Sequence, residues 1–231
     1  RVAWDLRYPT PDAVRLSPPP VSPFGNPPVG PLVLPGQYSV TLAKRVNGVV
    51  TELSDPQSFT LKALHDTPEA SDDREVLLAF QQDTATLVRV VAGAIDTSAE
   101  LRNRLAHLKL GADAIGSDSA SIQAQIQSLE ARLDDVDVAL TGDRTISSRN
   151  EPAPWSIAAR ISQIRGWGWY TQAPTTGSNV DALAIAKTEL DTALTQMRAI
   201  DAGIARAEQT LQDSGAPFTP GSGVPDWGLE D

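Results

Sequence analysis

Several residue types that carry chemistry in proteins are scarce or missing in this chain of 231 residues. It has no cysteine and only two histidines, which excludes disulfides, thiolate nucleophiles and cysteine-bound metals. Neither His65 nor His107 lies in a motif that would place a base beside a nucleophile. We therefore expect no catalytic residue and no cofactor, and we predict that the chain is not an enzyme.

The acidic residues form no recognisable metal site. Asp134, Asp135 and Asp137 are close in sequence, but on a continuous helix their carboxylates diverge. Asp113 and Asp118 lack the twelve-residue calcium-loop pattern. No carboxylate pair can be assigned to glycoside hydrolysis, and no glycine-rich phosphate loop is present. We expect a solvated acidic surface without a bound metal.

Long apolar runs and an excess of positive charge are also lacking. No window approaches the roughly 18 apolar residues of a membrane-spanning helix, so we expect membrane association only through a partner. The net charge is −10, and residues 67–231 hold thirteen Lys/Arg against twenty-four Asp/Glu. This balance argues against nucleic acid, which needs basic patches, and fits a basic or neutral protein partner.

Residues 1–66 have the pattern of β structure. The segments VAWDLRY, PGQYSVTLAKRV, VVTELS and QSFTLKAL each indicate a strand, since apolar residues alternate along them. Asn47-Gly48 predicts a tight hairpin turn, because both residue types tolerate positive φ. Four strands predict a small sandwich-like domain, and its start in strand-like sequence suggests a longer precursor.

A proline-rich segment, LSPPPVSPFGNPPVGPLVLPG, lies between the first two of these strands. Proline fixes φ and lacks a ladder N–H, so we expect an extended surface loop. It is either a spacer across the end of the sheet or a docking arm with Phe24 at its tip.

At residues 66–68 the apolar period changes to that of helices, and Asp72, with Glu75 three residues later, is predicted to cap the first helix. On the first predicted helix, the residues expected to face the core are spaced alternately three and four positions apart. We call such a series a seam, and this one comprises Leu77, Phe80, Thr84, Leu87, Val91, Ala94, Ser98, Leu101, Leu105 and Leu108. A second helix carries Ile122, Ile126, Leu129, Leu133, Val136 and Leu140; a shorter third carries Ile157, Ile161 and Ile164. The fourth, with Ser178 and Asp181 as a predicted cap, carries Leu183, Leu190, Leu194, Met197, Ile204 and Leu211.

The fold class predicted from these patterns is α+β. A proline-rich, sandwich-like β domain at 1–66 is followed by an elongated antiparallel four-helix bundle at 67–214. Residues 215–231 are expected to form an extended tail.

The segments VAWDLRYPTPDA, LPGQYSVTL, SFTLKALHD and APTTGSNVDALAIAKTELDTALTQMRAI resemble the C-terminal region of exported bacterial sortilin-like or Asp-box β-propeller proteins labelled "glycosyl hydrolase". The resemblance covers most of the chain. It implies that the β domain at 1–66 is of immunoglobulin-like or fibronectin-like type, that a helical segment follows it, and that the protein is periplasmic or extracellular. No resembling motif is catalytic, because the propeller that would hold sugar chemistry is not in this sequence.

The aromatic residues are the main candidates for partner contact. Trp155, Trp167, Trp169 and Tyr170 lie within one short stretch, and Phe218 and Trp227 lie in the tail. They either fill the end of the bundle and the joint with the β domain, form a patch for a protein partner, or form a carbohydrate platform. We predict partner binding by Phe24, Trp167, Trp169, Tyr170, Phe218 and Trp227.

The function predicted from the sequence is that of a non-catalytic structural and interaction module. One version is an extrinsic periplasmic subunit that stabilises a larger assembly, for example a membrane-bound photosynthetic reaction-centre–antenna complex. The alternative is a carbohydrate-binding accessory region of an exported β-propeller protein.

Overall fold

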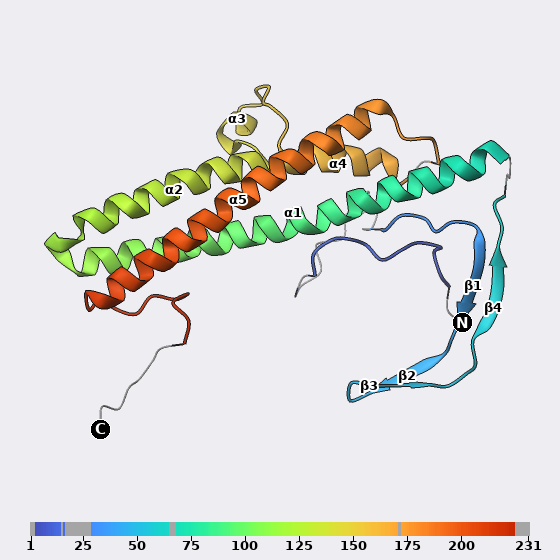
Figure 1. Ribbon diagram of the computed structural model, residues 1–231, viewed down its shortest axis with the longest axis horizontal. Coiled ribbons are helices and arrows are strands. Elements are labelled where there is room, and N and C mark those ends of the chain that lie inside the picture. The colour runs from blue at the N-terminus through green and yellow to red at the C-terminus, as the bar shows by residue number, and fades with distance from the viewer. Residues whose placement is uncertain (1–2, 15, 17–28, 65–67, 171, 225–231) are drawn as a thin grey trace.

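The structure is a computed structural model that describes residues 3–14, 16, 29–64, 68–170 and 172–224. It combines α and β elements, as predicted (Figure 1). The strands are β1 (Gly36–Val40), β2 (Ala43–Val46), β3 (Val49–Glu52) and β4 (Gln57–Leu61). The helices are α1 (Pro68–Ala114), the 3₁₀ turn η1 (Gly116–Ser119), α2 (Ala120–Thr141), α3 (Arg144–Ser148), α4 (Ile157–Gly168) and α5 (Gly177–Asp213).

The four strands form one long ribbon. β1 pairs antiparallel with β4, and β2 pairs antiparallel with β3, in two two-stranded sheets that follow one another. At the tip, Asn47 (φ 48°) and Gly48 (φ 82°) make the predicted tight turn. We call residues 36–61 the β ribbon.

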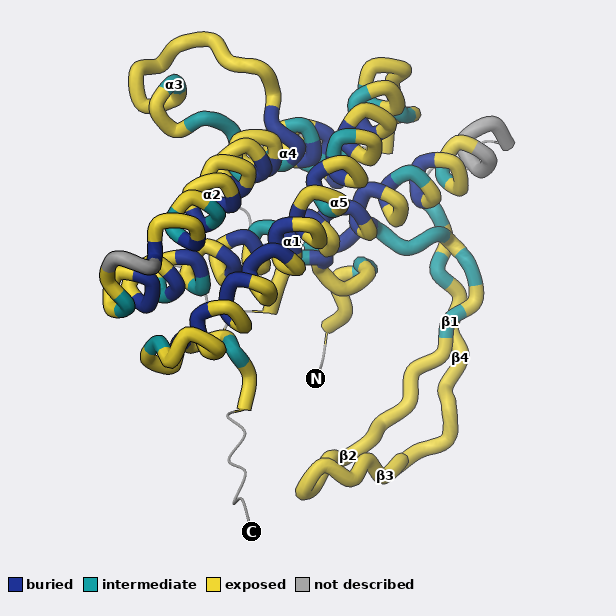
Figure 2. Tube along the Cα trace, turned by 60° about the vertical axis from the view of Figure 1, so that its left-hand side comes forward, coloured by how far each residue is buried: buried dark blue, intermediate teal, exposed yellow. Residues whose placement is uncertain are grey.

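The predicted β-sandwich is not formed by the described residues, because the β ribbon has no second sheet packed on either face. Most of its residues are exposed, and Figure 2 shows it projecting from the helices. The predicted first strand is reduced to a single bridge between Arg7 and Leu32. Prolines on both sides of these residues interrupt the ladder there.

The helical seams predicted from the sequence are confirmed. All six apolar residues predicted on α2 are buried, as are Ile157, Ile161 and Ile164 on α4. On α1 and α5 the predicted residues are buried except Phe80 and Leu194, which are partly buried against the same core. Because this core runs the length of the helices, it holds α1, α2, α4 and α5 together.

The arrangement of the helices differs from the predicted antiparallel four-helix bundle. Asp83 of α1 pairs with Lys187 of α5 at 2.5 Å, and Arg104 of α1 pairs with Asp201 of α5 at 2.6 Å. Because the residue numbers increase in the same direction along both helices, α1 and α5 run parallel. α2 and α4 both run against them and lie in series, α2 along the C-terminal part of α1 and α4 along its N-terminal part (Figure 1). Along most of its length the body is therefore three helices thick.

Two helix starts also differ from the predictions. α5 begins at Gly177 with Thr176 as its N-cap, whose Oγ1 accepts a hydrogen bond from the Asn179 N–H at 3.3 Å. The cap predicted at Ser178 therefore lies two residues too late. The capping residue predicted at Asp72 lies inside α1, which begins at Pro68.

The segment after α5 folds back onto α1 rather than trailing away, as far as Val224. Thr219 is buried, and a Cβ atom added to Gly111 would lie 3.2 Å from its methyl group. A Cβ atom on Gly221, which has φ 105°, would lie 2.8 Å from the Arg104 side chain. The described part of the predicted tail thus covers the end of the α1–α5 contact.

Candidate functional site

The aromatic turn, residues 166–170, joins the N-terminal segment to the helical body. Arg7 Nη1 donates hydrogen bonds to the Gly30 carbonyl at 2.9 Å and to the Trp169 carbonyl at 3.2 Å. From α1, Gln81 donates to the Gly168 carbonyl at 2.6 Å. The bonds to Gly168 and Trp169 satisfy carbonyls that the end of α4 would otherwise leave without partners.

Trp169 is part of the interior and not of a surface patch. Its side chain is 2% exposed, and the guanidinium of Arg165 lies 4.7 Å from the ring centroid. Arg165 in turn binds both carboxylate oxygens of Asp12, at 2.5 and 2.6 Å. The prediction that Trp169 contacts a partner is therefore corrected, because its indole already fills the joint with the N-terminal segment.

The other predicted partner-binding residues lie in different environments. Tyr170 is exposed, with Arg7 5.9 Å from its ring centroid. Phe218 is exposed on the segment that folds back after α5. Trp167 belongs to the α4 backbone, but its side chain, like Phe24 and Trp227, lies outside the described residues. The structure thus brings Trp169 and Tyr170 together and places Phe218 at the opposite end of the helical body.

A second aromatic cluster lies where the β ribbon leaves the body. Trp4 lies 5.4 Å from Tyr38 and 6.4 Å from Phe59 between ring centroids, and Tyr38 stacks on Phe59 at 5.9 Å. Tyr38 and Phe59 are cross-strand partners, so the alternation of the two strands indicates their shared face. Nothing in the sequence indicated that Trp4 would join them.

The β ribbon carries exposed apolar side chains beyond this cluster. Strand alternation and register put four of them on one face of the distal sheet: Leu42, Val46, Val49 and Leu53. At the tip, Val46 is 57% and Val49 is 66% exposed. A two-stranded ribbon is at best marginally stable alone in water, and this one exposes both its apolar side chains and its backbone edges.

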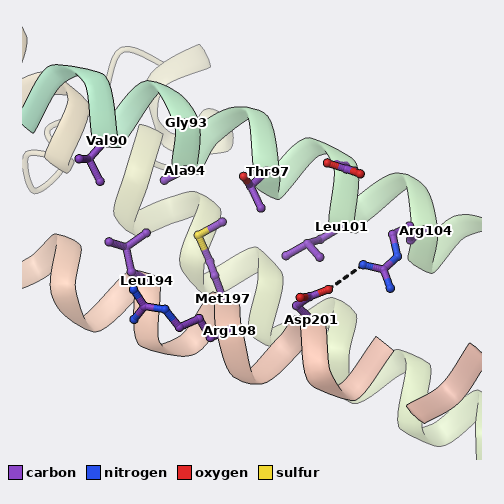
Figure 3. Close-up of a pocket in the computed structure, with 11 residues that line it drawn as sticks. Val90, Gly93, Ala94, Thr97, Leu101, Arg104, Leu194, Met197, Arg198 and Asp201 are labelled. Carbon is purple, nitrogen blue, oxygen red and sulfur yellow. Dashed lines mark hydrogen bonds and ion pairs between the residues drawn. The ribbon is translucent and has the colours of Figure 1, made fainter. Parts of the chain in front are cut away.

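Several hollows lie along the helices, among them two that border α5. One, of about 450 Å³, follows the outer side of the α1–α5 contact (Figure 3). Leu101 and Arg104 of α1 and Met197 and Asp201 of α5 line it. The other, of about 540 Å³, lies between α2, α3 and α5 and is lined in part by the half-exposed Trp155.

An ion-pair cluster closes the first hollow at one end. Arg104 donates to both carboxylate oxygens of Glu208, at 2.9 and 2.8 Å, and to Asp201 at 2.6 Å. Hydrogen bonding to Glu208, and then to Asp201, raises the pKa of Arg104 above its ordinary value despite partial burial. The guanidinium therefore stays charged, and its visible role is to tie α1 to α5.

Two further charged groups, Asp143 and Arg102, have structural roles. Asp143 caps α3, and hydrogen bonds from the Thr145 hydroxyl and N–H lower the pKa of its carboxyl. Hydrogen bonds from Arg102 to Asp137, and then to Asp134, raise the pKa of its guanidinium. Among the described residues, no group of three or more histidines and carboxylates could hold a metal ion.

None of the described helices combines the length and the apolar character that a membrane crossing requires. Comparisons with protein-family models, with curated proteins and with solved structures found no match to this chain. The resemblance to Asp-box β-propeller proteins therefore stays a prediction.

Proposed function

We propose that this chain is a non-catalytic interaction module, in which a rigid helical body holds out the β ribbon to a protein partner. The larger assembly is an exported one, periplasmic or extracellular, and the chain is an extrinsic part of it. A membrane-bound complex such as a reaction-centre–antenna assembly is one setting of this kind.

The observation that carries this proposal is the exposure of the β ribbon. Contiguous apolar patches exposed on a protein mark interaction sites. Here the apolar side chains lie on an element with no core of its own, so a partner would supply the stabilisation that the ribbon lacks. The helical body, by contrast, buries its seams internally.

Carbohydrate binding is supported less well. It depended on a platform of aromatic rings, but Trp169 is buried and Trp155 lies at a separate hollow. Along the distal sheet of the β ribbon the exposed apolar side chains are valine and leucine, which offer no stacking surface for sugars.

The test compares two pairs of exposed valines in the full-length chain, purified by an affinity tag from its native source. Val46→Asp with Val49→Asp places charge at the ribbon tip, and we expect co-purifying partners to fall at least about tenfold, because two apolar contacts are lost. The matched control, Val76→Asp with Val180→Asp, changes two other exposed valines, one on α1 and one on α5. Partner recovery that is equal for both double variants would refute the proposal.

A further inference from the structure

The two long edges of the β ribbon carry opposite charges. The edge built from β1 and β2, residues 36–46, contains Lys44 and Arg45 and no carboxylate. The edge built from β3 and β4, residues 49–61, contains Glu52 and Asp55 and no Lys or Arg. The ribbon is therefore polarised across its width.

The two cations are available for a partner. Both side chains are exposed, and neither lies within ion-pair distance of a carboxylate among the described residues. The chain as a whole has a net charge of −10. Carboxylates are therefore abundant elsewhere in it, but none of those described forms an ion pair with Lys44 or Arg45.

The backbone beside them is also open. The Leu53 N–H donates to the Leu42 carbonyl at 2.7 Å, which makes these two residues a hydrogen-bonded pair of the β2–β3 ladder. In an antiparallel ladder, hydrogen-bonded pairs alternate with non-hydrogen-bonded pairs. The backbone N–H and C=O groups of Lys44 therefore face β3, whereas those of Ala43 and Arg45 face away from β3. No described strand pairs with that side of β2.

We propose that the β1–β2 edge binds an extended acidic strand of a partner protein, a proposal that rests on the chain being an interaction module. The partner strand adds to β2 through backbone hydrogen bonds, which supply the affinity of strand addition. Lys44 and Arg45 are adjacent, so they point to opposite faces of the sheet. They select a strand that carries carboxylates at adjacent positions.

The same residues argue against a second copy of this chain as the occupant. Two β2 strands paired about a two-fold axis would place either Lys44 opposite Lys44 or Arg45 opposite Arg45 of the other copy, and like charges directly opposite are destabilising. The acidic edge of a second copy offers only Glu52 within a strand. The helical parts, which hold most of the negative charge, would also repel each other.

The test measures binding of labelled heptapeptides to the full chain by fluorescence anisotropy. The first peptide has two adjacent glutamates flanked by valine and threonine, the second has lysines in their place, and the third is the glutamate peptide with N-methyl groups along one backbone edge. We expect the first to bind, the second to bind at least about tenfold more weakly because charge pairs become repulsive, and the third not to bind because its ladder is blocked.

Variants of the chain complete the test. Lys44→Glu with Arg45→Glu should reverse the preference between the glutamate and lysine peptides. Arg132→Glu with Arg206→Glu makes the same change of net charge on α2 and α5, at exposed positions, and should leave the preference unchanged.

Three results would overturn the proposal. The first is failure of the glutamate peptide to bind, or equal binding of its N-methylated form. The second is a dimer in light scattering that the Lys44→Glu/Arg45→Glu variant disperses, which would make a second copy the occupant. The third is charge-dependent sedimentation with phosphatidylcholine–phosphatidylglycerol vesicles, which would point to a lipid surface. If partners still depend on Val46 and Val49 while the peptides fail, the interaction module stands and only this partner chemistry is wrong.

Discussion

At the scale of single residues, the charged groups divide into those that hold the fold and those that face solvent. Glu208 is the clearest of the first kind, since its side chain is 7% exposed and accepts two hydrogen bonds from Arg104. Asp134 is of the second kind, with its side chain largely exposed beside Arg102. Both are carboxylate–guanidinium pairs between helices, so burial is the variable that separates them.

Replacing Glu208 should therefore cost more stability than replacing Asp134. Glu208→Ala leaves the partly buried guanidinium with Asp201 alone, and we expect the free energy of unfolding to fall by about 3 kcal/mol. Asp134→Ala should lower it by about 0–1 kcal/mol, because solvent screens an exposed pair. Urea denaturation followed by circular dichroism measures the free energy of unfolding of both variants. Equal decreases would show that burial does not make the Arg104–Glu208 pair more stabilising than the exposed pair.

At the scale of elements, the sequence predicted what is buried better than where elements begin. The three- and four-residue spacing on α2 identified every residue of its buried face, because a helix with one apolar stripe has only one face to bury. The start of α5 was misplaced because Thr176 and Ser178 are both good N-cap residues. Only the backbone conformation of Thr176, which is extended, distinguishes them.

The β ribbon marks the limit of strand patterns. Alternation identified the strands, and the Asn47-Gly48 turn fixed their pairing, but neither indicates whether a second sheet covers them. The exposed valines at the tip have the same sequence pattern as valines in a core. For this reason the sandwich was expected and the projecting ribbon was not.

Two glycines inside helices should respond to alanine in opposite ways. Gly93 on α1 has open space where a Cβ would lie, so Gly93→Ala should raise the free energy of unfolding by about 1 kcal/mol through helix propensity. Gly203 on α5 packs against α2, where a Cβ would come within 2.6 Å of Leu129, which is itself buried. Gly203→Ala should lower the free energy of unfolding, because overpacking against Leu129 costs about 1–3 kcal/mol and offsets the gain in helix propensity.

Urea denaturation of the two alanine variants gives the comparison directly. A stabilising Gly203→Ala would mean that α2 and α5 are less closely packed than the structure places them. A destabilising Gly93→Ala would mean that the outer side of α1 at this position is covered.

At the scale of the whole molecule, the direction of α5 could not be predicted from its seam. A heptad stripe specifies the face that is buried but not the direction of the neighbour, since knobs fit holes in either orientation. Helix length did contain the missing information. α2 and α4 together would span about 51 Å, close to the roughly 56 Å of α5, as expected if both lie in series along it.

The parallel arrangement of α1 and α5 can be tested by cross-linking, because the chain has no cysteine to interfere. Asp83 and Lys187 approach within 2.5 Å, so Asp83→Cys with Lys187→Cys should cross-link efficiently with a short bismaleimide. The loss of this exposed ion pair should cost no more than about 1 kcal/mol. In the control, Asp83→Cys with Asp201→Cys, the second cysteine lies fourteen residues further along α5, about 21 Å away, and should cross-link poorly. Mass spectrometry of the monomer band distinguishes these products from intermolecular ones, and equal yields from both pairs would contradict the three-helix arrangement that holds out the β ribbon.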